Sequence, residues 1–172
     1  MSDSNRLPKE VPFFKHLLIR VIVLRFVWLL TKLSSLWSKL RIASLCPQAM
    51  NVACHWSVEI KYPENIKFGK GVVIGKSVTL GAKGGITLGD NVRISKGVSI
   101  ETGGLDFSSE PPYLHISKSI VIEEGVWVGS NAIILAGVTI GARAIIGAGT
   151  VITKNVSAGS IVVGSSNRVI NK

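Results

Sequence analysis

Hydrophobic residues recur every six positions through most of this chain, from Ile60 almost to the C-terminus. The aliphatic positions of the repeat are Phe68, Ile74, Leu80, Leu88, Ile94, Ile100, Ile122, Val128, Ile134, Ile140, Ile146 and Ile152. A small or β-branched residue follows most of them four positions later, and glycine often comes directly after, as in Ile140-Gly141. This period predicts an all-β solenoid, in which short parallel strands stack into coils and each coil buries the core face of its neighbour.

The distances between equivalent positions predict the shape of the coils. Ile60, Leu80 and Ile100 lie 20 residues apart, so the first coils each carry two residues more than three repeats. After Ile122 the period is a strict six, so one coil takes 18 residues and has three flat faces. The inward residues are expected to stack in three rows, which are Leu88, Ile122 and Ile140; Ile94, Val128 and Ile146; and Leu80, Ile100, Ile134 and Ile152.

A different pattern precedes the solenoid and divides the chain into residues 1–50, a basic amphipathic helical segment, and residues 51–172, the solenoid. Residues 12–45 are predicted to form the helix. Arg20 and Arg25 interrupt its most apolar stretch, so it lacks the run of about 18 uncharged apolar residues that spans a membrane. The same arginines argue against a secretory signal, whose apolar core excludes charge.

Positive charge is concentrated in this helical segment. The chain has a net charge of +10, and residues 1–44 contribute +6 of it, from eight Lys/Arg and two acidic residues. Basic side chains can reach lipid headgroups while Trp28 and Trp37 lie at headgroup depth, so we expect an interfacial helix on the cytoplasmic face of the cell membrane. Packing of the helix on a neighbouring subunit or over the end of the solenoid is the alternative. No nucleic-acid recognition fold accompanies the charge, which argues against nucleic acid as a partner.

The six-residue repeat is interrupted once, by a loop at residues 101–120. A loop of this length on a rigid scaffold is expected to be functional. It contains His115, the one solenoid histidine that is expected to project freely, whereas His55 is expected to have a structural or surface role. Cys46 and Cys54 are not spaced like a zinc or redox pair, so the sequence predicts reduced thiols and no metal site.

Four consecutive motifs in the solenoid carry a family resemblance. They read Ile122-Glu-Glu-Gly-Val-Trp-Val-Gly-Ser130, Ile134-Leu-Ala-Gly-Val-Thr-Ile-Gly141, Ile146-Gly-Ala-Gly-Thr-Val-Ile-Thr-Lys154 and Val162-Val-Gly-Ser-Ser-Asn-Arg-Val-Ile170. With these motifs, residues 62–170 resemble the hexapeptide-repeat acyltransferases, and among them the bacterial sugar and polysaccharide O-acetyltransferases. The resemblance implies a left-handed parallel β-helix, a homotrimer with sites between subunits, and acetyl-CoA as donor. It also implies a carbohydrate acceptor in a cell-surface polysaccharide or its lipid-linked precursor.

The resemblance assigns donor binding to residues along a line of coil corners. These residues are Trp127, Ser130, Ala148, Thr153, Lys154 and Arg168. Ala148 matches a position whose backbone lies beside the pantetheine arm of CoA, while Thr153 and Lys154 match positions near the adenosine phosphates. The residue types suit these roles, because small corners let a thin chain approach the backbone and cations attract phosphates.

The catalytic residue is where the chain departs from the family pattern. Many relatives carry the catalytic histidine in a Thr-Gly-Ser-His-Asp type motif, and here that stretch reads Thr102-Gly-Gly-Leu105-Asp106. Some members with leucine at this place resemble this chain in carrying histidine in a segment like His115-Ile-Ser-Lys118. His115 is therefore the expected general base, and Asp106 or Glu101 is expected to orient its ring.

Three other functions compete with sugar acetylation. A serine O-acetyltransferase-like enzyme shares the solenoid, but its Asp-His-Ala-Thr and Arg-His-Pro motifs are missing from this sequence. A β-helical carbonic anhydrase needs three histidine ligands for zinc, and the solenoid offers only His55 and His115. A non-catalytic trimeric scaffold that keeps the donor-site motifs stays open because of Leu105.

Overall fold

The computed structural model describes residues 13–47, 49, 51–108, 110–164 and 168–170, which belong to two compact units, Met1–Leu36 and Trp37–Lys172. The second unit starts inside the helix, ahead of the boundary between residues 50 and 51 that the sequence pattern suggests. The reason is that the last turns of the helix pack on the first coil and belong to the solenoid unit.

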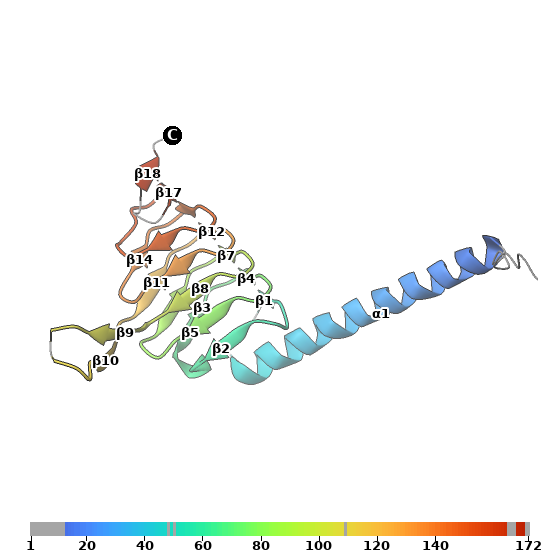
Figure 1. Ribbon diagram of the computed structural model, residues 1–172, viewed down its shortest axis with the longest axis horizontal. Coiled ribbons are helices and arrows are strands. Elements are labelled where there is room, and N and C mark those ends of the chain that lie inside the picture. Colours follow the sequence, from blue (N-terminus) through green and yellow to red (C-terminus); the bar gives the residue numbers. More distant parts are fainter. Residues whose placement is uncertain (1–12, 48, 50, 109, 165–167, 171–172) are drawn as a thin grey trace, which may run out of the picture. The chain divides into compact units, whose positions relative to one another are not determined.

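The first unit consists of helix α1 (Phe13–Leu45) up to Leu36, which confirms the helix predicted over residues 12–45 (Figure 1). Its apolar side chains are exposed from Ile19 onward, with Trp28 at 62%. The helix sequence contains no Asp or Glu, so its charged side chains are all basic. Within the described residues, no helix is both long enough and apolar enough to cross a membrane.

The end of α1 covers the first coil of the solenoid. Arg41 Nη1 donates to the carbonyl oxygens of Trp56 (2.7 Å) and Val58 (2.8 Å), and the Ser38 hydroxyl donates to the carbonyl of Cys54. These carbonyls lie at the open end of the coil stack, where no earlier coil supplies a partner. Capping of the solenoid, one of the two expected roles of the helical segment, therefore applies to these last turns.

Burial raises the pKa of the Cys54 thiol to about 11, which keeps it protonated.

Three parallel sheets form the faces of the solenoid, and their strand orders match the predicted rows. Face 1 contains β1 (Ala53–Cys54), β4 (Val73–Ile74), β7 (Arg93–Ile94), β12 (Trp127–Val128), β15 (Ile145–Ile146) and β17 (Ile161–Val163), with β18 (Arg168–Ile170) antiparallel at its end. Face 2 contains β2 (Glu59–Lys61), β5 (Thr79–Gly81), β8 (Ser99–Glu101), β13 (Ile133–Ile134) and β16 (Val151–Ile152). Face 3 contains β3 (Ile66–Phe68), which follows the short 3-10 helix Pro63–Asn65, then β6 (Ile86–Leu88), β11 (Ile120–Ile122) and β14 (Thr139–Ile140).

The core runs along the axis of the coils. Leu80 pairs with Ile100, Ile100 with Ile134, and Ile134 with Ile152, and all four side chains are fully buried. The two other predicted rows are confirmed in the same way, through pairs such as Leu88 with Ile122. Inward residues of successive coils lie at the strand spacing of about 4.8 Å, so each coil covers the apolar surface of the next. The fold is the predicted left-handed parallel β-helix.

The turns between faces stack into three corners, named here for what they carry. The lysine corner joins face 1 to face 2 and comprises residues 55–58, 75–78, 95–98, 129–132 and 147–150. The loop corner joins face 2 to face 3 and comprises residues 82–85, 102–119, 135–138 and 153–155. The acidic corner joins face 3 to face 1 and comprises residues 69–72, 89–92, 123–126, 141–144 and 157–160. Such turns need left-handed backbone, which Gly97 (φ 69°) and Asn131 (φ 58°) supply at equivalent places of the lysine corner.

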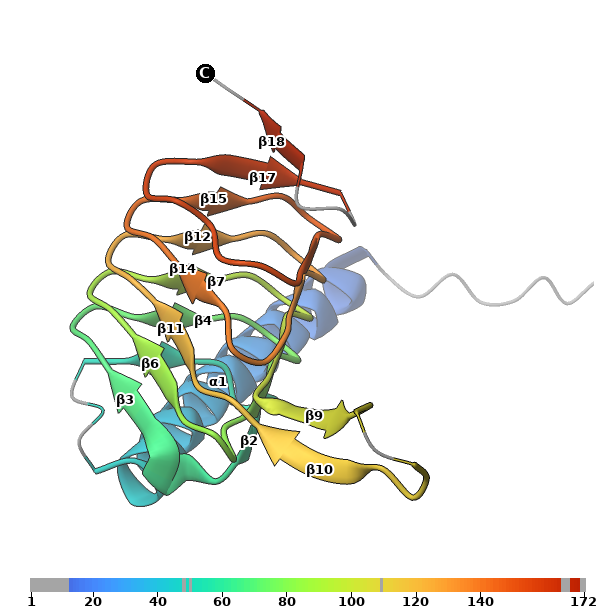
Figure 2. The same ribbon diagram turned by 90° about the vertical axis from the view of Figure 1, so that its left-hand side faces the viewer.

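The interruption of the repeat is a β-hairpin that leaves the coils at the loop corner (Figure 2). Strand β9 (Gly103–Asp106) pairs antiparallel with β10 (Leu114–Ser117). The hairpin is shorter than the loop predicted at residues 101–120, because Glu101 still belongs to β8 and Ile120 already belongs to β11. It is inserted into the third coil, which β7, β8 and β11 form.

Candidate functional site

The hairpin fixes which of its side chains can act together. His115 lies directly opposite Leu105, and Leu114 lies directly opposite Asp106. Residues directly opposite each other point to the same face of a ladder, and neighbours along a strand point to opposite faces. His115 and Asp106 therefore project from opposite faces of the hairpin, and the structure does not bring the expected base together with this orienting carboxylate.

Asp106 has a different set of partners. Its Oδ1 accepts hydrogen bonds from the hydroxyl (2.7 Å) and the backbone N–H (3.0 Å) of Ser108. The Ser108 hydroxyl, followed by its N–H, holds the pKa of Asp106 below its usual value. This carboxylate closes the turn after β9. Glu101, the other expected orienting residue, lies on face 2 with its carboxylate over Gly81 of the coil below. Among the described residues, neither carboxylate bonds to His115.

His115 is exposed and shares its face of the hairpin with Leu105. Leu105 stands at the place where the family motif has its histidine. Directly opposite residues of an antiparallel pair have Cβ atoms about 4.5–5.5 Å apart. The imidazole of His115 therefore projects from the same face of the hairpin as the side chain at that family position, but from β10 instead of β9.

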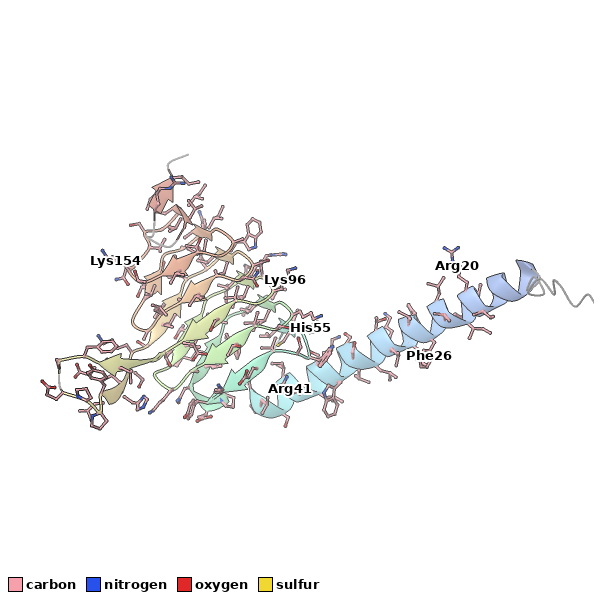
Figure 3. All side chains as sticks on the ribbon, in the orientation of Figure 1. Arg20, Phe26, Arg41, His55, Lys96 and Lys154 are labelled. Atoms are coloured by element: carbon pink, nitrogen blue, oxygen red, sulfur yellow. The ribbon has the colours of Figure 1, made fainter. Side chains whose placement is uncertain are left out.

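The six expected donor residues do not lie along a single line, and four of them lie at two different corners. Ser130 and Ala148 occupy the lysine corner in consecutive coils, while Thr153 and Lys154 occupy the loop corner. In Figure 3, Lys154 points out from the edge at which the hairpin leaves, and Lys96 of the lysine corner points out from the opposite edge.

The remaining two expected donor residues, Trp127 and Arg168, lie in strands of the sheet that forms face 1. Trp127 lies on the outer side of face 1, is 53% exposed, and donates from Nε1 to Oγ of Ser95 (3.2 Å). This bond ties the indole to the third coil. Arg168 lies in β18 and pairs with Val163 at the last turn.

The lysine corner offers a narrow backbone surface around Ala148. A Cβ atom added to Gly129 would lie 2.6 Å from the backbone nitrogen of Ala148, so the coils approach each other too closely there for a side chain. Among the hydrogen bonds of the described residues, none uses the N–H of Ala148. A thin ligand chain along this corner would meet an available N–H donor.

Comparisons with known proteins agree with this architecture. Residues 119–154 match a family model described as bacterial transferase hexapeptide (six repeats), and residues 66–101 match one described as hexapeptide repeat of succinyl-transferase. No curated protein sequence gives a match.

Solved structures give closer parallels. A hexapeptide-repeat containing acetyltransferase from Vibrio cholerae is 28% identical over 71% of this chain and 70% of its own, with a TM-score of 0.66, and it has also been solved with acetyl coenzyme A. A maltose O-acetyltransferase from Clostridium difficile is 27% identical over 76% of this chain and 72% of its own, with a TM-score of 0.70. An N-acyltransferase from Bacillus cereus, 20% identical over 71% of this chain and 81% of its own (TM-score 0.56), shares the fold. The chain is therefore similar, in its repeats and in its fold, to the hexapeptide-repeat acetyltransferases.

Two lysines of the lysine corner did not stand out in the sequence. Lys76 and Lys96 occupy equivalent positions of the lysine corner, in the two coils below Ser130. The signal was their separation of 20 residues, which equals the length of the early coils. His55 lies at the same corner in the first coil, where Ser57 donates its N–H to Nδ1 (3.2 Å), so this ring is tied to its own turn.

Proposed function

We propose that the protein transfers an acetyl group from acetyl-CoA to a hydroxyl of a sugar, in a cell-surface polysaccharide or its lipid-linked precursor. The observation that carries this proposal is the position of His115, on the hairpin face where the family histidine would stand. Two relatives support the donor and the reaction: one is solved with acetyl coenzyme A, and the other is named as a maltose O-acetyltransferase.

His115 acts as the general base in this proposal. Its imidazole takes the proton of the acceptor hydroxyl while the hydroxyl oxygen attacks the thioester carbonyl. The tetrahedral oxyanion then collapses, the bond from carbon to sulfur breaks, and the imidazolium returns the proton to the leaving CoA thiolate. The products are the acetyl ester and free CoA thiol. No carboxylate among the described residues is bonded to His115, so its ring is oriented by the hairpin or by a neighbouring subunit.

Donor binding uses the corners above the third coil. The pantetheine arm follows the lysine corner, where Ser130 and the N–H of Ala148 are available. The adenosine phosphates lie near the cations Lys154 and Arg168, with Thr153 beside them. Trp127, held by Ser95, covers the donor from the side of face 1.

A homotrimer would join the two corners into one site. One chain presents the lysine corner and the loop corner at opposite borders of face 2. Ile133 of face 2 (39% exposed) and Leu135 at the start of the loop corner (40% exposed) are apolar residues that favour a subunit contact. In a closed three-fold ring the contact is between two different surfaces, so the lysine corner of one subunit can lie beside the loop corner of the next.

The experiment that tests the activity is CoA thiol release from acetyl-CoA, measured with the full chain and a panel of sugars and polysaccharide fragments. We expect sugar-dependent release that falls by about a hundredfold or more in His115→Ala. His55→Ala is the matched control, because that ring is tied to Ser57, and it should keep full activity. Equal rates in the wild type and His115→Ala would remove His115 from the mechanism. No release from any variant, with acetyl-CoA still bound, would favour the scaffold function that Leu105 keeps open.

We also propose that α1 holds the enzyme at the anionic cytoplasmic face of the membrane. The apolar side chains exposed from Ile19 to Leu36 and the purely basic charge support this assignment. In Figure 3, Arg20 and Phe26 point from different sides of α1. Vesicle flotation should recover the full chain with anionic vesicles, and recovery should fall in Arg25→Glu/Lys32→Glu. Recovery that is independent of lipid charge, or absent, would count against this role of α1.

A further inference from the structure

The lysine corner carries positive charge for which the described residues provide no ion-pair partner. Lys76 and Lys96 are exposed in consecutive coils, and Arg93 is exposed on face 1 in the same coil as Lys96. Among the described residues the ion pairs are Lys61 with Glu59 and Arg143 with Glu124. Lys76, Lys96 and the neighbouring Arg93 therefore have no ion-pair partner among the described residues.

The acids that border this group of cations have other partners: Glu59 on face 2 pairs with Lys61, and Asp90 accepts the N–H of Lys70. The turns of the lysine corner, residues 55–58, 75–78, 95–98, 129–132 and 147–150, contain no Asp or Glu. The outward residues of face 1 beside them are Ala53, Val73, Arg93, Trp127 and Ile145, again without an acid. Equivalent positions in consecutive coils are about 4.8 Å apart along the axis, so the two lysine stems start close together. Like charges held this close repel each other, and a bound anion would relieve the repulsion.

Lys76 and Lys96 lie at the part of the corner where the acceptor is expected in the proposed function. In the proposed function the donor occupies the corner at Ala148 and, one coil lower, at Ser130. Lys96 follows one coil below Ser130, and it lies in the third coil, from which the hairpin with His115 leaves. The thioester must reach the level of His115, so the acceptor lies beyond it, at the level of Lys96 and Lys76.

We propose that Lys76, Lys96 and Arg93 bind an anionic group of the acceptor, so that the substrate is an acidic sugar. The anion is a carboxylate of a hexuronic acid or a phosphate of a sugar phosphate. Lysine ammonium groups attract either as point charges, and the Arg93 guanidinium can hold two oxygens of one anion. A neutral sugar would leave the charge of this corner without a counterpart. This inference rests on the proposed acetyl transfer, whose site it completes.

Matched acceptor pairs test the proposal. One pair is trigalacturonate and its carboxyl-reduced neutral form, and the other is glucose 1-phosphate and methyl glucoside. Calorimetric titration of the full chain with CoA bound, which has no acetyl group to transfer, should show the anionic member of a pair binding about tenfold tighter or more than the neutral one. In Lys76→Gln/Lys96→Gln this preference should fall to about twofold or less, while the KM for acetyl-CoA stays at the wild-type value.

Lys67→Gln provides the matched control. Lys67 is exposed on the outer side of face 3, away from the lysine corner, so this variant should keep the full preference. Preference for the uronate alone identifies a carboxylate as the anion, and preference for the sugar phosphate alone identifies a phosphate.

Two results would overturn the assignment: equal binding of charged and neutral members by the wild type, or a preference that survives in Lys76→Gln/Lys96→Gln. Failure of the proposed acetyl transfer looks different. It gives no thiol release with any acceptor, whereas the charge preference in calorimetry is read without turnover.

Discussion

The lysine corner and the acidic corner are built on the same kind of turn but use their polar side chains differently. At the acidic corner, Asp90 Oδ1 accepts the N–H of Lys70 (2.7 Å) and Glu123 Oε2 accepts the N–H of Ala142 (2.8 Å). Each carboxylate thus ties one coil to its neighbour. At the lysine corner, the charged group of Lys96 has no ion-pair partner among the described residues.

Two alanines make the contrast sharper. Gly141-Ala142 and Gly147-Ala148 are the same step of the repeat at successive corners. The Ala142 N–H is taken by Glu123, while the Ala148 N–H is used by no hydrogen bond of the described residues. At this step of the repeat, the N–H is bonded to a carboxylate at the acidic corner and is unbonded among the described residues at the lysine corner. The difference supports the proposal that the donor lies along the lysine corner.

Of the variants that compare the two corners, Ala148→Gln is expected to have the largest effect on donor binding. Ala148→Gln places a long side chain where the pantetheine arm is proposed to run, so the KM for acetyl-CoA should rise by about tenfold or more. Ala142→Gln adds the same atoms at the acidic corner and should leave this KM unchanged. Steady-state thiol release with varied acetyl-CoA measures both. Equal increases in the two variants would mean that the corners do not differ in donor binding.

The fold followed from the sequence because a six-residue period is a local property. Counting from Leu80 to Ile100 and Ile134 gave the correct stacking, since each strand pairs with its equivalent one coil away. The helix limits followed from the apolar pattern, and only the assignment of its last turns needed the hydrogen bonds of Arg41.

The site was less predictable, for two physical reasons. The register of the hairpin depends on how its turn closes, and spacing alone could not show that Asp106 faces away from His115. The corner to which a residue belongs, by contrast, follows from its position in the six-residue repeat. Lys154 comes two residues after Ile152 of face 2, so it belongs to the loop corner and not to the corner of Ala148. In the proposed function a second subunit brings the two corners together, and the sequence of one chain does not show how subunits meet.

Subunit mixing sharpens the comparison between corners. His115→Ala damages the loop corner and Ala148→Gln damages the lysine corner. When the two variants are coexpressed, about a quarter of the sites in random trimers should pair two intact corners, so activity should recover to about a quarter of the wild type. Thiol release by copurified, differently tagged chains measures this, at acetyl-CoA well below the wild-type KM, where Ala148→Gln alone is about tenfold slower. Activity no higher than the mean of the two separate variants would place each site within one chain.

The smallest effect is expected at the acidic corner itself. Asp90→Ala removes an exposed, charge-assisted hydrogen bond to the N–H of Lys70, which should lower the free energy of unfolding by about 1 kcal/mol. Activity should stay at the wild-type level, because no residue of the proposed site lies at this corner. Lys96→Ala should show the reverse, with unchanged stability and weaker binding of acidic sugars. Urea unfolding measures stability, and thiol release measures activity. If Asp90→Ala instead reduced activity with no loss of stability, the acidic corner would also bind a ligand and the division between the two corners would be wrong.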